Sequence, residues 1–248
     1  ATLPITVTID ANPTITLGAN PEVCEGEVLA NLSYSATTGT PDQYSIDFDA
    51  AAEAEGFVDV VNAVLPATPI GITVPGAAIT GIYNAVITVS NSTTGCISPG
   101  DPITITINPS PTITLGANPE VCEGTVLANL AYSATTNSPD QYSIDFDATA
   151  EAQGFVDVID AALPATPIGI TVPGAAIAGV YNATITVRNS GTTCVSPGTP
   201  ITVTINPNPT ITLGADPAVC QGAVTADLTY SATTGTPDQY SIDFDAAA

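Results

Sequence analysis

Residues 13–24 read Pro-Thr-Ile-Thr-Leu-Gly-Ala-Asn-Pro-Glu-Val-Cys, and the same twelve residues return unchanged at residues 111–122. A third copy at residues 209–220 differs only in carrying Asp216 and Ala218. Each copy begins 98 residues after the previous one. A fixed long period is the mark of a tandem array. The sequence therefore predicts several copies of one folded unit.

The period divides the chain into repeats. Residues 11–108 are repeat 1, residues 109–206 are repeat 2, and residues 207–248 are the N-terminal part of repeat 3. Residues 1–10 resemble the end of repeat 1 and are interpreted as the last strand of a preceding repeat. Because 98 residues can bury a hydrophobic core, each repeat is expected to fold by itself. The Asn-Pro-Ser-Pro linker at residues 108–111 should be short and stiff.

Alternation of polar and apolar residues predicts seven strands in repeat 1. In the third strand, Tyr44, Ile46 and Phe48 should face the core. A short helical crossover is expected after it at residues 50–55, with Asp49 as the N-cap. This pattern predicts an all-β fold of tandem seven-stranded, antiparallel, Ig-like β-sandwiches. The expected strands are residues 14–17, 29–38, 43–49, 57–61, 70–74, 83–90 and 103–107.

The charge balance is one-sided. The chain has 24 acidic residues, one basic residue, Arg188, and no His, for a net charge of −23. Such a chain repels phosphate groups and anionic lipids, which argues against nucleic acid and membrane surfaces as partners. No stretch reaches the ~20 apolar residues of a membrane span. Without His, and with a single base, the usual catalytic groups are missing, so we expect no enzyme.

Repeat 1 ends with Gly81-Ile-Tyr-Asn-Ala-Val-Ile-Thr-Val-Ser-Asn91, followed by Gly95-Cys96. This ending resembles the Gly-x-Tyr-x-Val-x-Leu-x-Val-x-Asn…Gly-Cys ending of PKD-like (Ig-like) domains. The third strand is similar to the Trp-Asp-Phe-Gly-Asp-Gly strand of that family, with Ile46 in the place of Trp. Such domains are repeated many times in giant surface adhesins of Bacteroidota. The resemblance implies an extracellular seven-stranded sandwich in a stalk or filament.

Five cysteines follow the period: Cys24 and Cys96 in repeat 1, Cys122 and Cys194 in repeat 2, and Cys220 in repeat 3. With no Cys-x-x-Cys and no His, a zinc site is not expected. Regular pairs of cysteines in a Lys-poor chain favour disulfides in an oxidising compartment. Buried free thiols are the alternative.

Two pairings of these cysteines are open. Distance along the sequence favours Cys24 with Cys96. In a seven-stranded sandwich, however, the loops after the first and sixth strands lie at opposite ends, roughly 25 Å apart. The Cα atoms of a disulfide must lie within ~7 Å. Cys24 is therefore predicted to pair with Cys194 of the next repeat, and Cys96, Cys122 and Cys220 to have partners outside this chain.

Two kinds of ligand site are candidates. Asp47, Asp49 and Asp59 offer carboxylates that suit Ca²⁺, although a solvated face with a helix cap also explains them. Apart from this calcium ion, no cofactor is expected. Tyrosines could stack on sugars, but Tyr44 and Tyr83 share a strand phase with Ile and Val, which predicts the core.

These observations favour a structural function. The chain is interpreted as a stalk or filament segment of a secreted, surface-attached protein of the adhesin type, stiffened by proline linkers and disulfides. Its partners would be neighbouring repeats of the same chain. The alternative is a multivalent array in which each repeat binds a glycan or calcium weakly and many copies gain avidity. Lateral self-assembly into fibres is a third option, since uncovered strand edges without Lys pair readily.

Overall fold

The computed structural model describes residues 5–244, which form two compact units. The first unit comprises the described residues up to Thr112 together with Thr135–Asp140 and Val187–Pro197. The second comprises Ile113–Ala134, Gln141–Thr186 and the described residues from Gly198 onward. Residues 109–112 and two further short segments of repeat 2 thus belong to the same unit as repeat 1. The boundaries of the repeats as folding domains stay a prediction.

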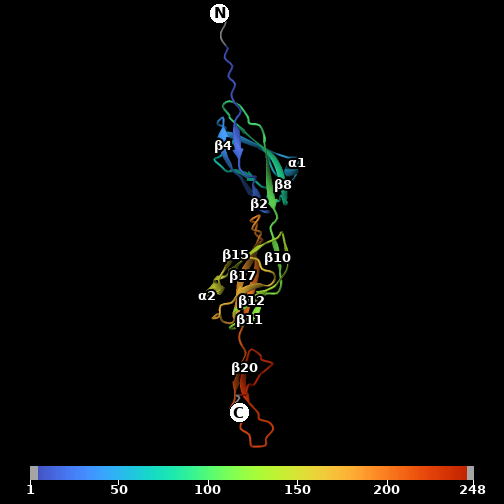
Figure 1. Cartoon of the computed structure of the whole chain (residues 1–248), viewed down its shortest axis with the longest axis vertical. Coiled ribbons are helices and arrows are strands. Elements are labelled where there is room, and N and C mark those ends of the chain that lie inside the picture. Colours follow the sequence, from blue (N-terminus) through green and yellow to red (C-terminus); the bar gives the residue numbers. More distant parts are fainter. Residues whose placement is uncertain (1–4, 245–248) are drawn as a thin grey trace. The chain divides into compact units, whose positions relative to one another are not determined.

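Among the described residues, each full repeat has nine strands and one short helix (Figure 1). Repeat 1 contains β1 (Thr14–Leu17), β2 (Glu22–Cys24), β3 (Leu29–Leu32), β4 (Tyr34–Thr38), β5 (Gln43–Phe48), α1 (Ala50–Ala54), β6 (Val60–Val64), β7 (Ile70–Thr73), β8 (Gly81–Ser90) and β9 (Asp101–Asn108). Repeat 2 contains β10 (Thr112–Leu115), β11 (Glu120–Cys122), β12 (Leu127–Leu130), β13 (Tyr132–Thr136), β14 (Gln141–Phe146), α2 (Ala148–Ala152), β15 (Val158–Ala162), β16 (Ile168–Thr171), β17 (Gly179–Arg188) and β18 (Thr199–Asn206). Repeat 3 contributes β19 (Thr210–Leu213) and β20 (Tyr230–Thr234).

The strands of repeat 1 form one five-stranded sheet in the order β2-β9-β8-β5-β6 and two pairs, β1-β4 and β3-β7. Neighbouring strands are antiparallel, except that β2 runs parallel to β9. Repeat 2 has the same arrangement, with a β11-β18-β17-β14-β15 sheet and the pairs β10-β13 and β12-β16. The chain is therefore all-β with tandem β-sandwich repeats, as the sequence predicted.

The core of repeat 1 lies under one face of β5. Tyr44, Ile46 and Phe48 are buried there, which confirms the predicted alternation. The ring of Phe57 lies 5.0 Å from that of Phe48 and 4.9 Å from that of Tyr83. These separations are typical of favourable aromatic pairs. The three rings therefore pack α1 and the segment after it onto the sheet.

Helix α1 begins and ends where the sequence predicted. Asp49 is the N-cap, and its Oδ1 accepts a hydrogen bond from the amide of Ala52 at 2.8 Å. The chain leaves the helix through Gly56, whose φ of 95° favours glycine. Ala52 is buried, and α1 lies beside β8 (Figure 1). In the described part of the chain, no helix is long and apolar enough to cross a membrane.

The predicted single strand at residues 29–38 is wrong, because the chain changes partner within it. β3 pairs with β7, whereas β4 pairs with β1. At the change, the amide of Gly18 donates to the carbonyl oxygen of Ser33 at 2.7 Å. A Cβ on Gly18 would lie 2.1 Å from the Ser33 hydroxyl oxygen, so the close approach requires glycine. This crossing moves the chain from one strand pair to the other.

Two further strand predictions are corrected. No strand was predicted between residues 17 and 29, but β2 lies there and pairs with β9 as a parallel edge strand. The strand expected from Phe57 begins only at Val60, after Asp59. Before β6 starts, the carboxylate of Asp59 accepts a hydrogen bond from the amide of Phe48 at 2.9 Å. At the end of β5, the Asp59 carboxylate thus accepts the hydrogen bond that the backbone of a neighbouring strand would otherwise accept.

The N-terminal segment does not form the predicted strand. Part of the predicted range, residues 1–4, lies outside the described residues. Residues 5–10 have no regular secondary structure and are exposed. Their equivalents at residues 103–108 lie in β9, which is held between β2 and β8. In the described part of the chain, residues 5–10 belong to no sheet.

Candidate functional site

The candidate site surrounds Cys24, which lies at the end of edge strand β2. β2 is held parallel to β9, with Cys24 opposite Asn108. The amide of Glu25 donates to the carbonyl oxygen of Asn108 at 2.9 Å, and the Asn108 side chain donates to the carboxylate of Glu22 at 3.2 Å. These bonds fix both the strand and the residue after the cysteine. Cys24 is thus presented at one end of the five-stranded sheet of repeat 1.

The second cysteine, Cys194, lies in a loop organised by Asn189. The side-chain oxygen of Asn189 accepts hydrogen bonds from the amides of Gly191 at 2.9 Å and Thr192 at 3.2 Å. The amide of Asn189 donates to the carbonyl oxygen of Cys194 at 3.0 Å, which closes the loop. Such Asx-type loops are locally specified and form around a single side chain.

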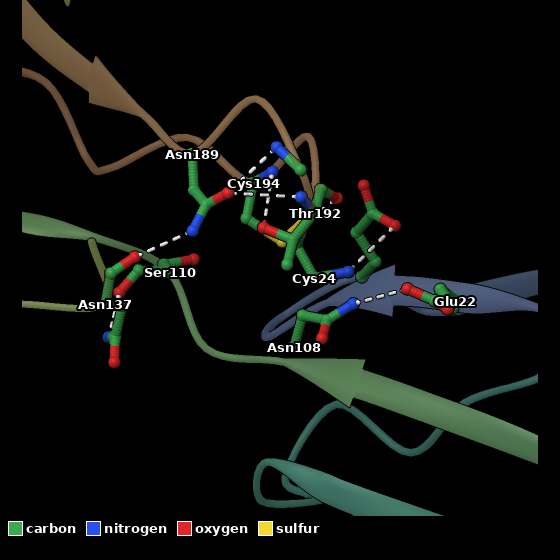
Figure 2. The surroundings of a disulfide bond; sticks show 10 residues. Glu22, Cys24, Asn108, Ser110, Asn137, Asn189, Thr192 and Cys194 are labelled. Carbon is green, nitrogen blue, oxygen red and sulfur yellow. Dashed lines mark hydrogen bonds between the residues drawn. A yellow bond between two sulfur atoms is a disulfide. The ribbon is translucent and has the colours of Figure 1, made fainter. Parts of the chain in front are cut away.

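A chain of amides connects this loop to the linker between the repeats. The side-chain amide of Asn189 donates to the carbonyl oxygen of Asn137 at 3.0 Å. The side-chain amide of Asn137 in turn donates to the carbonyl oxygen of Ser110 at 2.8 Å. Figure 2 shows these bonds beside the two cysteines. The linker, the loop and β2 all belong to the first compact unit.

Cys24 and Cys194 form a disulfide with a Cα–Cα distance of 5.5 Å (Figure 2). The bond joins repeat 1 to repeat 2 across a sequence separation of 170 residues. This is the pairing predicted from the geometry of a sandwich, and the alternative of Cys24 with Cys96 is wrong. Cys194 is fully buried once the bond has formed. Asn108, Asn137 and Asn189, which support the site, were missed by the sequence analysis, although Asn108 and Asn189 each have an Asn equivalent 98 residues away.

Cys96, Cys122 and Cys220 are free thiols. Cys122 is presented as Cys24 is, because β11 pairs in parallel with β18 and places it opposite Asn206. The sulfur of Cys96 lies 3.8 Å from the carbonyl oxygen of Asp10, the residue 98 positions before Asn108. The assignment of their partners to other repeats stays a prediction.

The structure does not gather the three candidate calcium ligands. Asp49 caps α1 with one carboxylate oxygen and accepts a hydrogen bond from the side chain of Asn84 with the other, at 2.9 Å. Asp59 accepts from the amide of Phe48, and Asp47 is exposed. No group of three or more His, Cys, Asp or Glu side chains in the described residues is placed to hold a metal ion. Calcium binding stays a prediction from residue type alone.

The equivalent aspartates of repeat 2 line a shallow depression. Its volume is about 540 Å³, and its wall includes Asp145, Asp147, Asn118 and Asn182. Asp147 is already engaged as the N-cap of α2 and by the side chain of Asn182 at 2.9 Å. Two of the polar side chains in the wall, Asp147 and Asn182, are thus bonded to each other and to the helix.

In repeat 1, Tyr44 and Tyr83 do not offer their rings for sugar stacking. Tyr44 and Tyr83 are buried in the core of repeat 1, as predicted from their strand phase. The hydroxyl of Tyr83 donates to the carbonyl oxygen of Ile79 at 2.6 Å, and that of Tyr34 donates to the carbonyl oxygen of Pro66 at 2.6 Å. Burial and desolvation raise the pKa of Tyr83. Both hydroxyls thus form hydrogen bonds within repeat 1.

A carboxylate stabilises the loop that carries Cys194. Asp140 accepts hydrogen bonds from both the hydroxyl and the amide of Ser190, and these bonds hold the pKa of Asp140 below its usual range. The charge of Arg188 lowers this pKa further. Asp42 has the same contacts with Ser92 in the loop before Cys96, and its pKa is lowered for the same reason.

The lowered pKa gives a pH prediction. Because the folded-state pKa of Asp140 lies below the unfolded value of about 3.9, its contribution is complete at neutral pH and is lost as the pH falls through the folded pKa. Amide hydrogen exchange of residues 190–194 should therefore accelerate on acidification from pH 7 to pH 3, beyond the change in intrinsic exchange. Asp140→Asn should show the faster exchange already at pH 7. Asp145→Asn, which removes an exposed acid elsewhere, should leave the exchange of these residues unchanged. Equal exchange in both variants would contradict the stabilising role of Asp140 in this loop.

Comparison with known proteins gives only distant matches. No protein-family model and no curated protein matches the sequence. The chicken CNTN1 FN1–FN3 domains are 11% identical, with 80% of this chain and 68% of that chain covered and a TM-score of 0.40. The I67–I69 fragment of titin is 10% identical, with 90% and 77% covered and a TM-score of 0.36. A two-domain fibronectin type III segment of chicken tenascin is 15% identical, with 78% and 99% covered and a TM-score of 0.30.

These matches are tandem fibronectin type III or Ig-domain chains, and their TM-scores all lie below 0.5. At that level they carry no conclusion about the function of this chain. Its fold class follows instead from its own strand order and core.

Proposed function

We propose that this chain is a structural segment of an extracellular repeat protein, a stalk or filament in which disulfides hold successive β-sandwiches together. The observation that carries the proposal is the Cys24–Cys194 disulfide, which joins two repeats rather than closing a loop within one. A disulfide inside a single domain would stabilise that domain alone. A bond between repeats restricts how one repeat moves against the next, which serves a protein whose task is mechanical.

The chemistry of the chain supports an extracellular, surface-attached protein. Disulfides persist in oxidising compartments and are rare in the cytosol. The adhesin type, and membership of the PKD-like domains of Bacteroidota surface proteins, are proposed from the resemblance of residues 81–96 and 44–49. The near absence of Lys and Arg fits a surface that does not bind nucleic acid or anionic lipid.

The same features favour a structural over a catalytic function. The sequence has no His and a single Arg or Lys, so general acid–base chemistry would depend on carboxylates alone. Two of these, Asp49 and Asp147, are already engaged as helix caps. The main partner of each repeat is therefore proposed to be the neighbouring repeat of the same chain. Glycan or calcium binding would add a second function to this arrangement.

The proposal is tested by the freedom of repeat 2 relative to repeat 1. The native thiols Cys96 and Cys122 lie in different repeats, and both accept spin labels in a Cys220→Ser background. We expect electron–electron double resonance to give a narrow distance distribution between the two labels while the Cys24–Cys194 bond is intact. The Cys24→Ser, Cys194→Ser double variant carries the same labels and should give a clearly broader distribution. Equal widths would show that the bond does not restrict the repeats, and the stalk proposal would then be abandoned.

A further inference from the structure

We propose that the Cys24–Cys194 disulfide is a tension bypass: a pull along the chain passes through this bond and leaves the stretch between the two cysteines unloaded. The inference rests on the proposed function, because only a stalk or filament is pulled along its length. It follows from which elements lie inside the covalent loop and which lie outside it.

The loop encloses most of both sandwiches. Between Cys24 and Cys194 lie all elements from β3 to β17, including both helices. A force applied at the two ends of the chain reaches Cys24, crosses the sulfur–sulfur bond to Cys194 and continues toward the C-terminus. The stretch between the two cysteines, which lie 170 positions apart, is therefore not part of the taut covalent path.

The path outside the loop has little slack. After Cys194 it runs through β18 (Thr199–Asn206), the Pro207-Asn-Pro209 linker and β19 (Thr210–Leu213). A strand already rises ~3.3 Å per residue, close to the limit of a fully extended chain. The 26 residues from Cys194 to Cys220 (220 minus 194) can therefore span at most about 90 Å.

The direction of the load matters for β18. The strand is held at its N-terminal side by Cys194 and pulled at its C-terminal side by the linker. The tension therefore acts along β18 itself and does not peel it from its neighbours β11 and β17. In a chain without the disulfide, the same pull would act on the first and last strands of each sandwich and separate these strands from the rest of the repeat.

The geometry repeats along the sequence. Cys122 and Cys220 recur at 98-residue steps from Cys24, and Cys122 has the same strand pairing opposite Asn206. Wherever loop cysteines follow them at the spacing of Cys194, the same bypass would recur. The amide and carbonyl groups that present Cys122 are in place although its thiol is free. The site on repeat 2 is thus formed before any bond is made.

The test stretches the whole 248-residue chain between enzymatically attached handles at its two ends, so that no cysteine is consumed. We expect the oxidised chain to reach a final length about 600 Å shorter than the Cys24→Ser, Cys194→Ser double variant, because the stretch between cysteines 170 positions apart is never extended. The unfolding steps of the two repeats should appear in the double variant and be absent from the oxidised chain. Dithiothreitol added under load should restore the missing length.

Cys122→Ser is the matched control, since it removes an equivalent thiol that has no partner in this chain. It should stretch as the oxidised parent does. Unfolding steps of both repeats in the oxidised parent, or a final length equal to that of the double variant, would overturn the bypass. A broad spin-label distribution combined with a shortened final length would reject the stiff stalk and leave the bypass standing, so the two proposals fail separately.

Discussion

Replacing Cys24 with serine is expected to lower the free energy of unfolding by about 5 kcal/mol, shared between the two repeats that the disulfide joins. The value follows from the loss of chain entropy in the unfolded state when a loop of 170 residues is closed. Because the loop contains most of both sandwiches, both should unfold at lower urea concentration. Urea titration followed by tyrosine fluorescence and by far-ultraviolet circular dichroism measures the effect.

The control for this experiment is Cys122→Ser. Cys122 occupies the same position on β11 that Cys24 occupies on β2, but its thiol is free. It should therefore leave the urea midpoint of the parent unchanged. Dithiothreitol should lower the urea midpoint of the parent to that of Cys24→Ser. The same treatment should leave the midpoint of Cys24→Ser unchanged. A Cys24→Ser protein as stable as the parent would mean that the bond adds nothing to the stability of the repeats.

Replacing Phe57 with alanine is expected to destabilise repeat 1 by about 3–5 kcal/mol. Phe57 is 3% exposed, and its ring lies between those of Phe48 and Tyr83. Removing the ring leaves a cavity under α1 and ends both aromatic contacts. The sandwich cannot close this cavity easily, because β5 and β8 are already paired along their length.

Two variants of the same chain sharpen this prediction. Val58, the next residue, is 77% exposed, so Val58→Ala should change stability by less than about 0.5 kcal/mol. Phe155, the equivalent of Phe57 in repeat 2, has the same contacts with Phe146 and Tyr181. Phe155→Ala should therefore show a loss of similar size. If amide hydrogen exchange shows that each substitution loosens both repeats equally, the repeats do not fold by themselves.

Much of the fold could be read from the sequence because local rules and tertiary structure agree. The alternation of Tyr44, Ile46 and Phe48 with polar residues placed one face of β5 in the core. Asp49 before an Ala-rich run identified the start of α1, since a carboxylate that accepts from the first helical amides is a local device. In both cases the information lies within a few residues.

The errors lie where a distant partner decides the local structure. The split between β3 and β4 depends on Gly18, which receives the backbone at Ser33. β2 has only three residues and exists as a strand because β9, more than 70 residues away, lies beside it. The late start of β6 depends on the carboxylate of Asp59, which bonds to the end of β5. No local sequence pattern predicts these contacts.

The sequence by itself determined the period of 98 residues, the sandwich class and the spacing of the cysteines, because repetition and alternation are properties of the chain. It also favoured Cys24 with Cys194 over Cys24 with Cys96 once a sandwich was assumed, since the two ends of a strand are too far apart for a disulfide. Only the tertiary structure decided that Cys24 meets Cys194, supported by Asn108 on one side and Asn189 on the other. A disulfide needs two Cα atoms within a few ångströms, and that distance is set by how whole sheets fold, which no single stretch of residues contains.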